Sequence, residues 1–420
     1  MKRTTFLAIL AALPLFAMAQ SLTWDDCKQM AHTNYPVIKQ YGMVASMRDY
    51  NVSNAAKGWL PQISVGAGAN AFTDILDVNE RMKQMGIDTK NYAVGGLLSL
   101  KQSIYDGGQI RAAQGVAKAQ ADVDTNQLSV TMHDVDERIE QLFFGILTLD
   151  EQLRQNALLQ QDLLISSQTV SSLMAHGLAN QGDMDVINVE RVRAEQQAEA
   201  ISSSRKAYVQ MLATFIGKDL NENVTLVKPQ MFSPFPKDVW GLSRPEIAYY
   251  ASRNQLFDAQ RHQLDTRLRP TVGLIGAGLI HTNVSNMVHN ATLLAGVSLT
   301  WNIGALYTRK NDLRRLDVQR QQNDNLRETF LFNNRLQNEE ADGKIQSLRK
   351  QLSKDTEIVA LQESIRQTKE KKVKLGTETV NELVRSINSV SMARQQQSLH
   401  ELQLLQAICH SHTLNGLQEK

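Results

Sequence analysis

Apolar residues recur at alternating steps of four and three along much of the chain, which is the pattern of coiled-coil helices. The longest seam lies within residues 107–176, a stretch without proline that would extend roughly 105 Å as a helix at 1.5 Å per residue. Shorter seams follow it and recur in the second half of the chain. The pattern predicts two long helical hairpins, over residues 107–215 and 304–408. The seam residues are Leu128, Met132, Val135, Ile139, Leu142, Ile146, Leu149, Leu153, Ile201, Tyr208, Leu212, Phe215, Ile345, Leu348, Leu352, Val380, Leu383, Ile387 and Val390.

Four shorter stretches alternate apolar residues with polar residues or glycine, which predicts β-strands. They form two pairs, 62–73 with 92–103 and 271–281 with 291–302, and polar loops join the members of each pair. Each strand is about ten residues long, as a tilted membrane strand requires, although an ordinary soluble pair of hairpins has the same pattern. The fold class is therefore mostly α with a small β part. Aromatic residues stand at the strand ends, where a membrane barrel carries its girdle: Trp59, Tyr92, Tyr105, Trp301 and Tyr307.

The order of these elements repeats within the chain. Pro36 and Pro61 lie 25 residues apart, and so do Pro245 and Pro270, at an offset of 209 residues. Later landmarks shift to an offset of 199 because the first pair of strands has the longer loop. The sequence thus predicts a duplicated unit of helix, strand pair and helical hairpin. Its parts are a first repeat over 20–227, a linker over 228–242 and a second repeat over 243–420.

The N-terminus has the features of a secretory signal. Lys2 and Arg3 precede an apolar run, and Ala17-Met18-Ala19 forms a cleavage site, so we predict a signal peptide over residues 1–19. A membrane anchor is the alternative, but the run is short for a transmembrane helix. No cysteine stands directly at the cleavage point, and we therefore expect no lipid at the N-terminus. The formal net charge of +2 gives no reason to expect a nucleic-acid partner.

Four strands raise a physical problem if they lie in a membrane. Open strand edges are not tolerated in lipid, and four strands cannot close a barrel alone. Several copies would have to share one barrel, and three copies would supply 4 × 3 = 12 strands. The helical hairpins would then hang beneath this barrel as a coiled-coil tube.

This plan resembles the outer-membrane efflux protein (TolC) family over nearly the whole mature chain. Leu22-Thr23-Trp24 and Asn34-Tyr35-Pro36 are similar to the family's opening helix, and Trp59-Leu60-Pro61 to the entry of its first strand. Asp106-Gly107-Gly108 is similar to the junction between strand and helix, and Arg244-Pro245-Glu246 to the start of the second half. No single motif is specific, but the ordered and duplicated set is.

The resemblance implies a homotrimer with a 12-stranded β-barrel in the outer membrane and an α-barrel in the periplasm. It also implies the partners of such a channel: outer-membrane lipid, a periplasmic adaptor (membrane fusion) protein and, through it, an inner-membrane transporter. No enzymatic activity and no cofactor are implied.

The candidate functional site is the pair of hairpin tips, which the resemblance implicates in gating and adaptor docking. Glycines at the two turns suit the positive φ that such turns need. Arg385 stands where the family commonly has a second carboxylate, so we expect contacts between Glu382 and Arg385 and no strong cation selectivity. The candidate residues are Gly177, Leu178, Asp183, Gly376, Thr377, Glu378, Glu382 and Arg385.

Other motifs in the sequence resemble cofactor or metal sites but stand in the wrong context. The glycines of residues 66–71 imitate a dinucleotide-binding motif but lie inside an alternating strand rather than at a strand-to-helix turn. Cys409-His410-Ser411-His412 has metal-donor types, but it lies in the polar C-terminal tail, and we expect no metal there. Whether Cys27 and Cys409 form a disulfide is left open. The sequence has no Walker motif, no H-E-x-x-H and no G-x-S-x-G.

These observations predict an outer-membrane exit duct of a tripartite efflux pump, with a long periplasmic extension. An exit duct for type I protein secretion is the first alternative, and the transported substrate is not specified by the sequence. A non-conducting periplasmic coiled-coil protein is the second alternative, although it would not explain the duplicated strand pairs.

Overall fold

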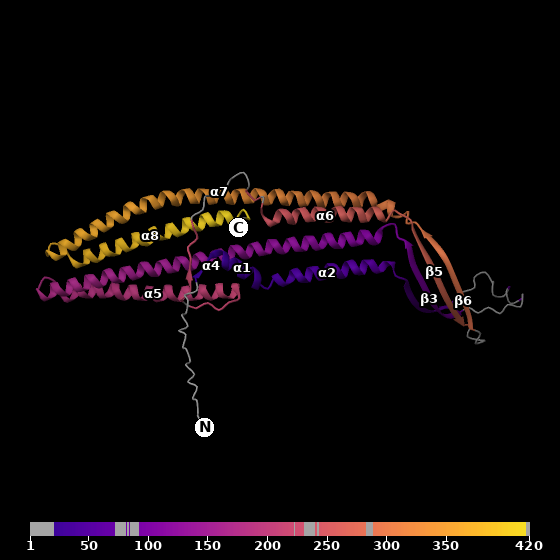
Figure 1. The fold of residues 1–420 in the computed structure, drawn as a ribbon, viewed down its shortest axis with the longest axis horizontal. Coiled ribbons are helices and arrows are strands. Elements are labelled where there is room, and N and C mark those ends of the chain that lie inside the picture. Colours follow the sequence, from indigo (N-terminus) through magenta and orange to yellow (C-terminus); the bar gives the residue numbers. More distant parts are fainter. Residues whose placement is uncertain are drawn as a thin grey trace, which may run out of the picture. The chain divides into compact units, whose positions relative to one another are not determined.

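The computed structural model describes residues 21–71, 81, 84, 92–221, 223–230, 240–241, 243–282 and 289–416. The predicted signal peptide, most of the loop over 74–90 and most of the linker over 228–242 lie outside these residues. The described chain forms two compact units (Figure 1). Unit 1 comprises residues 1–38, 132–243 and 334–420, and unit 2 comprises residues 39–131 and 244–333. Each unit therefore draws on both predicted repeats.

The predicted helical hairpins are present. The first consists of α4 (Gln109–Ala175) and α5 (Gln181–Ile216), and the second of α7 (Ala305–Lys374) and α8 (Val380–Thr413). The second hairpin continues five residues beyond the predicted end at 408, because apolar and small residues of the C-terminal stretch are buried there. From Leu128 to Ile146, every seam residue of α4 is buried, which confirms the coiled-coil seam.

The main core of unit 1 lies at the root of the hairpins. It joins α4, α5 and α8 to α1 (Trp24–Asn34) and to the short parallel pair of β1 (Ser21–Leu22) and β4 (Thr225–Leu226). Helix α1 begins with a reciprocal cap, in which the backbone N–H of Asp26 donates to Thr23 Oγ1 (3.2 Å) and Asp26 Oδ2 accepts from the backbone N–H of Thr23 (3.0 Å). Its inward face places Trp24 against Phe144 in an edge-to-face contact at 6.5 Å.

The two cysteines both lie in this core, as buried thiols that form no disulfide. Burial raises the pKa of the Cys27 thiol to about 12, so it stays protonated and behaves as a small apolar side chain. Of the two possibilities left open by the sequence, the structure has the pair of separate thiols.

One glycine in α4 is explained by a close approach. A Cβ atom on Gly145 would lie 2.5 Å from the ring of Tyr208 in α5. Tyr208, which was predicted as a seam residue, is 38% exposed and covers this glycine instead of filling the seam. The neighbouring seam residues Ile201 and Leu212 are buried as predicted.

Unit 2 contains the predicted strands as one antiparallel sheet in the order β2-β3-β5-β6. The strands are β2 (Gln62–Ala71), β3 (Tyr92–Tyr105), β5 (Thr271–Thr282) and β6 (His289–Thr300). All four predicted strands therefore exist, within two residues of the predicted bounds at each described end. The helices of unit 2 are α2 (Ile38–Ala56), the 3₁₀ turn η1 (Lys57–Trp59), α6 (Pro245–Thr266) and the first parts of α4 and α7.

The turn from β3 into α4 is built by Asp106-Gly107-Gly108. Both glycines have positive φ, 68° and 88°. The carboxylate of Asp106 accepts from the backbone N–H groups of Gly108 (2.8 Å) and Ile110 (2.6 Å), which caps the helix start. This motif therefore acts as the sequence predicted, as a sharp exit from the sheet.

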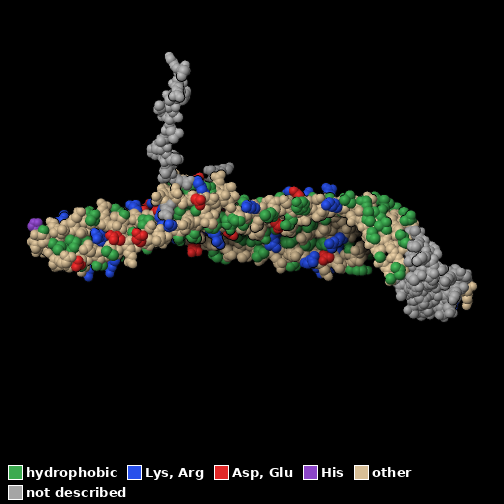
Figure 2. All heavy atoms as spheres, turned by 90° about the horizontal axis from the view of Figure 1, so that it is seen from below, with side chains coloured by type: hydrophobic (Ala, Val, Ile, Leu, Met, Phe, Trp, Pro, Cys, Tyr) green, Lys and Arg blue, Asp and Glu red, His purple; other side chains and the backbone are tan. Residues whose placement is uncertain are grey.

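The sheet is largely uncovered within one chain (Figure 2). Strands β2 and β6 each pair on one side only among the described residues. Many large apolar side chains of the strands are exposed to solvent, up to 90% for Leu293. The other strongly exposed ones include Ile63, Val65, Leu98, Leu294, Val297, Leu299 and Trp301.

Candidate functional site at the hairpin tips

The two helical hairpins turn through the same backbone motif. Gly177 and Gly376 have left-handed backbones, with φ of 70° and 69°. At the first tip, the backbone N–H of Leu178 donates to the carbonyl of Leu173 (2.9 Å), and that of Gly177 donates to the carbonyl of Met174 (3.0 Å). This is a Schellman motif, which needs a residue that tolerates positive φ. The matching bonds at the second tip join Thr377 to Lys372 (3.0 Å) and Gly376 to Val373 (3.0 Å).

The helices that leave the tips are capped differently. At the first tip, Asn180 Oδ1 accepts from the backbone N–H of Asp183 (3.1 Å), and the Asp183 carboxylate accepts from the backbone N–H of Asn180 (3.0 Å). At the second tip, Thr379 Oγ1 accepts from the backbone N–H of Glu382 (3.3 Å), and the structure contains no return bond from the Glu382 carboxylate to the cap. Asp183 thus closes its own turn, whereas Glu382 remains available for an ion pair.

The Glu382 carboxylate pairs with two basic side chains. It lies 2.9 Å from Lys369 Nζ and 3.1 Å from Arg385 Nη1, and Lys369 also lies 3.4 Å from Glu378. The hydrogen bond from Lys369 lowers the pKa of Glu382, and the same bond raises the pKa of Lys369. The contact between Glu382 and Arg385 that the sequence suggested is present, but Lys369 connects both glutamates of this tip.

Sequence reasoning missed Lys369. It precedes the turn glycine by seven residues and belongs to a lysine-rich run, Lys369-Glu370-Lys371-Lys372. Any of these lysines could face the turn in a sequence pattern. The rotation of α7 at its end decides that Lys369 is the lysine that faces Glu378 and Glu382. The spacing of the lysines in the sequence does not predict this choice.

The remaining candidate residues are exposed or complete the turns. Leu178 is 61% exposed, and its counterpart at the second tip, Thr377, donates its hydroxyl to the carbonyl of Lys372 (3.2 Å). Leu375, beside the second turn, is 76% exposed. Each tip therefore exposes a leucine side chain.

The two tips lie side by side in unit 1 because the two hairpins share a core (Figure 1). Above the tips, Asp162 of α4 lies 3.9 Å from Arg366 of α7 and 3.6 Å from Arg394 of α8. Asn388 of α8 donates to Glu190 of α5 (3.0 Å). These polar contacts tie one hairpin to the other. The shared apolar core consists of Leu163, Val170, Ile187, Ala194, Val373, Val380, Leu383, Val384 and Ile387.

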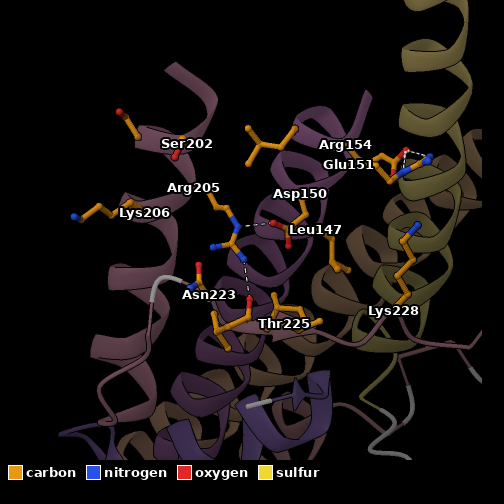
Figure 3. Close-up of a pocket in the computed structure, with 14 residues that line it drawn as sticks. Leu147, Asp150, Glu151, Arg154, Ser202, Arg205, Lys206, Asn223, Thr225 and Lys228 are labelled. Carbon is orange, nitrogen blue, oxygen red and sulfur yellow. Dashed lines mark hydrogen bonds and ion pairs between the residues drawn. The ribbon is translucent and has the colours of Figure 1, made fainter. Parts of the chain in front are cut away.

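A cavity of about 730 Å³ lies elsewhere in unit 1, between α4, α5 and the segment that forms β4 (Figure 3). Arg205 points toward Asp150 and pairs with it, and it also donates to the carbonyl of Val224 (2.7 Å). Beside it, Glu151 accepts from Arg154 (2.5 Å) and Gln155 (2.8 Å). Burial acts to raise the pKa of Glu151, but these hydrogen bonds outweigh it and lower the pKa to about 2. The charged groups of the cavity are therefore largely paired with one another.

Several histidines of unit 1 lie close to carboxylates in the described part of the chain. The most buried carboxylate among these is Glu140, which is 2% exposed and lies 3.1 Å from His410 Nδ1. The hydrogen bond to Glu140 raises the pKa of His410. The other pairs are His32 with Asp136 (2.6 Å), His133 with Glu137 (3.8 Å) and His400 with Asp355 (2.6 Å).

The described residues contain no metal site and no membrane-spanning helix. Within them, no cluster of three or more histidine, cysteine or acidic side chains has the geometry to hold a metal ion. The residues around Cys409 form no such cluster either. Among the same residues, no helix combines the length and the apolar character needed to cross a bilayer.

Solved structures with the same fold are outer-membrane channels. The chain is similar to the outer-membrane channel OprN, with 13% sequence identity and a TM-score of 0.70 over 94% of this chain and 89% of that one. It is similar to VceC of Vibrio cholerae, with 13% identity and a TM-score of 0.68 over 94% and 96% of the two chains. It is also similar to the MtrE channel of Neisseria gonorrhoeae, solved in an open state, with 11% identity and a TM-score of 0.65 over 94% and 88%.

The sequence itself matches no protein-family model and no curated protein sequence. Identities of 11–13% in the three structures establish the arrangement of the backbone rather than shared chemistry. The coverage nevertheless extends over nearly the whole chain, including both hairpins and the sheet. The resemblance in the sequence is thus confirmed in the fold, and the chain has the fold of the TolC-type outer-membrane efflux channels.

Proposed function

We propose that this chain is an outer-membrane export channel that works as a homotrimer. The observation that carries the proposal is the four-stranded sheet. Its outer strands β2 and β6 have no second neighbour among the described residues, and many of its apolar side chains are exposed. An exposed apolar sheet with open edges is unstable in water and intolerable in lipid. Three copies that join β6 of one to β2 of the next would form a 12-stranded barrel with no open edge.

The helical hairpins would then extend into the periplasm as an α-barrel. Helix α2 supports this assembly, because none of its residues is buried and it exposes Met43, Met47 and Tyr50 along one face. A stripe spaced by four and three residues suits a neighbouring helix. We assign that neighbour to another copy of the chain.

In this proposal, the tips dock on a periplasmic adaptor, which connects the channel to an inner-membrane transporter. The substrate passes through the duct, which has no catalytic role. OprN and MtrE are outer-membrane channels, which supports a conducting duct. Efflux is the proposed role of the duct, and a secreted polypeptide is the alternative cargo. Export would follow removal of the signal peptide after Ala19, without lipid attachment, and the two repeats would be the duplicated halves of each subunit.

The second tip would also be the gate. The pairs from Lys369 to Glu378 and Glu382 hold α7 to the start of α8, so their loss should loosen the tip. The control is Lys354→Gln, which removes a single pair with Glu357 earlier in α7, away from the tip.

The test uses the full chain, extracted from outer membranes with detergent. We expect a trimer by light scattering and steady conductance in a planar bilayer. Lys369→Gln should raise the conductance, and Lys354→Gln should leave it unchanged. A monomer that appears in the soluble periplasmic fraction and does not conduct would overturn the channel and favour a structural coiled-coil protein.

A further inference from the structure

The two tips share a backbone but differ in charge. Between residues 167 and 186, the first tip has two carboxylates and no lysine or arginine. Asp183 caps its own helix, and Asp185 accepts from Gln181 (2.8 Å). The carboxylates of the first tip are therefore engaged locally, and its exposed feature is Leu178.

The second tip is basic. Its glutamates are engaged by Lys369 and Arg385, as described above, and Lys374 pairs with Glu370 (2.8 Å). Lys371 and Lys372 are exposed, and the described part of the chain contains no ion pair for either side chain. Basic side chains lie close to this end of the molecule in Figure 2. The second tip thus presents positive charge that its own chain does not neutralise.

A helix C-terminus favours lysine by itself, because the helix dipole is negative there. That effect does not account for the difference between the tips. Helix α4 ends in the same Schellman motif as α7, yet its last turns, from Val170 to His176, contain no lysine or arginine. The dipole is common to both tips, whereas the lysines are present at only one.

We propose that Lys371 and Lys372 form an electrostatic contact with a protein partner whose docking surface carries carboxylates. The inference rests on the proposed docking role of the tips and specifies the chemistry of that partner. Burying two lysines against a neutral or basic surface would leave charges unpaired, which is costly, while facing carboxylates would restore pairing and steer the approach. The first tip supplies the apolar part of the same contact through Leu178.

The experiment is photo-crosslinking in living cells from two positions, Ala179 at the first tip and Leu375 at the second. The captured segment is identified by mass spectrometry. It is compared between the parent, the variant K371E/K372E and the control R349E/K350E, which reverses two exposed charges on α7 away from the tip. Trimer yield and helical circular dichroism check that each variant folds.

We expect one partner in both captures, with aspartate or glutamate in the segment crosslinked to Leu375. Capture should fall about tenfold or more in K371E/K372E, stay unchanged in R349E/K350E, and return when the partner's carboxylates are changed to lysine. Capture that is unaffected by K371E/K372E, or a captured segment without carboxylates, overturns the inference but leaves the docking role intact. Absence of any partner from both positions in the parent overturns the docking role and the inference together.

Discussion

Unit 1 and unit 2 bury their apolar residues to very different degrees. Unit 1 has a continuous core where its hairpins meet α1 and a second core close to the tips, both with side chains that are fully buried. Unit 2 leaves most large side chains of its sheet exposed, and its helix α2 buries none. Burial of apolar surface is the main stabilising term in water. The comparison teaches that unit 1 buries its apolar surface within one chain, whereas unit 2 leaves apolar surface that the proposed trimer and lipid would cover.

The largest expected effect comes from a core deletion in unit 1. Leu212→Ala removes a side chain with no exposed surface from the core around α4 and α5 and should lower the free energy of unfolding by about 2–5 kcal/mol. Hydrogen exchange of α4 and α5 in the detergent-solubilised protein measures it. Leu299→Ala in β6, where the side chain is 72% exposed, is the matched control and should leave that exchange unchanged. Equal effects in the two variants would refute the contrast between the units.

A smaller effect is expected from a buried carboxylate of unit 1. The folded-state pKa of Glu151, about 2, lies below its ordinary value of 4.5. The stabilisation is therefore present above about pH 4.5 and is lost as the pH falls toward 2. A difference of this size corresponds to at most about 3 kcal/mol. Glu151→Gln should remove this acid dependence from the unfolding free energy between pH 6 and pH 3.

Glu357→Gln provides the control for that titration. Glu357 pairs with Lys354 at 3.1 Å, but its side chain is 62% exposed, so solvent screens the pair. We expect its acid dependence to match that of the parent protein. If both variants lose the same dependence, the contribution of Glu151 is not specific to burial.

The sequence predicted the elements of both units because each has a strong period. Apolar residues spaced by four and three along α4 lie on one face of the helix, which a partner helix buries. Apolar residues that alternate in β5 and β6 lie on one face of the sheet. The turn glycines Gly177 and Gly376 were also predictable, because positive φ restricts the residue type.

The details of the tips were less predictable. Asp183 and Glu382 occupy equivalent positions, 199 residues apart, and both looked like candidate gate residues. Only the structure shows that Asp183 turns back to cap its helix while Glu382 pairs with Lys369. The choice depends on a side-chain rotation and on a lysine from another helix, neither of which has a period in the sequence.

The smallest expected effect is a pH dependence of the stability of unit 1, caused by His410. His410 is in unit 1 and faces Glu140 and Glu137, while Lys344 opposes them. Its pKa is raised, chiefly by the hydrogen bond to Glu140, so its stabilisation is present below about pH 6.5 and is lost as the pH rises through the folded-state value. The side chain is 42% exposed, and we therefore expect less than about 1 kcal/mol.

Unfolding of α8, followed by hydrogen exchange at pH 5.5 and pH 8, measures this contribution. In the parent protein, protection of α8 should be greater at pH 5.5, and His410→Gln should reduce that gain. His176→Gln is the control, because His176 lies at the exposed first tip and bonds only the carbonyl of Ser172 (2.7 Å) in the described structure. A gain that persists in His410→Gln would assign it to another group, and a gain toward pH 8 would contradict the direction of the His410 shift.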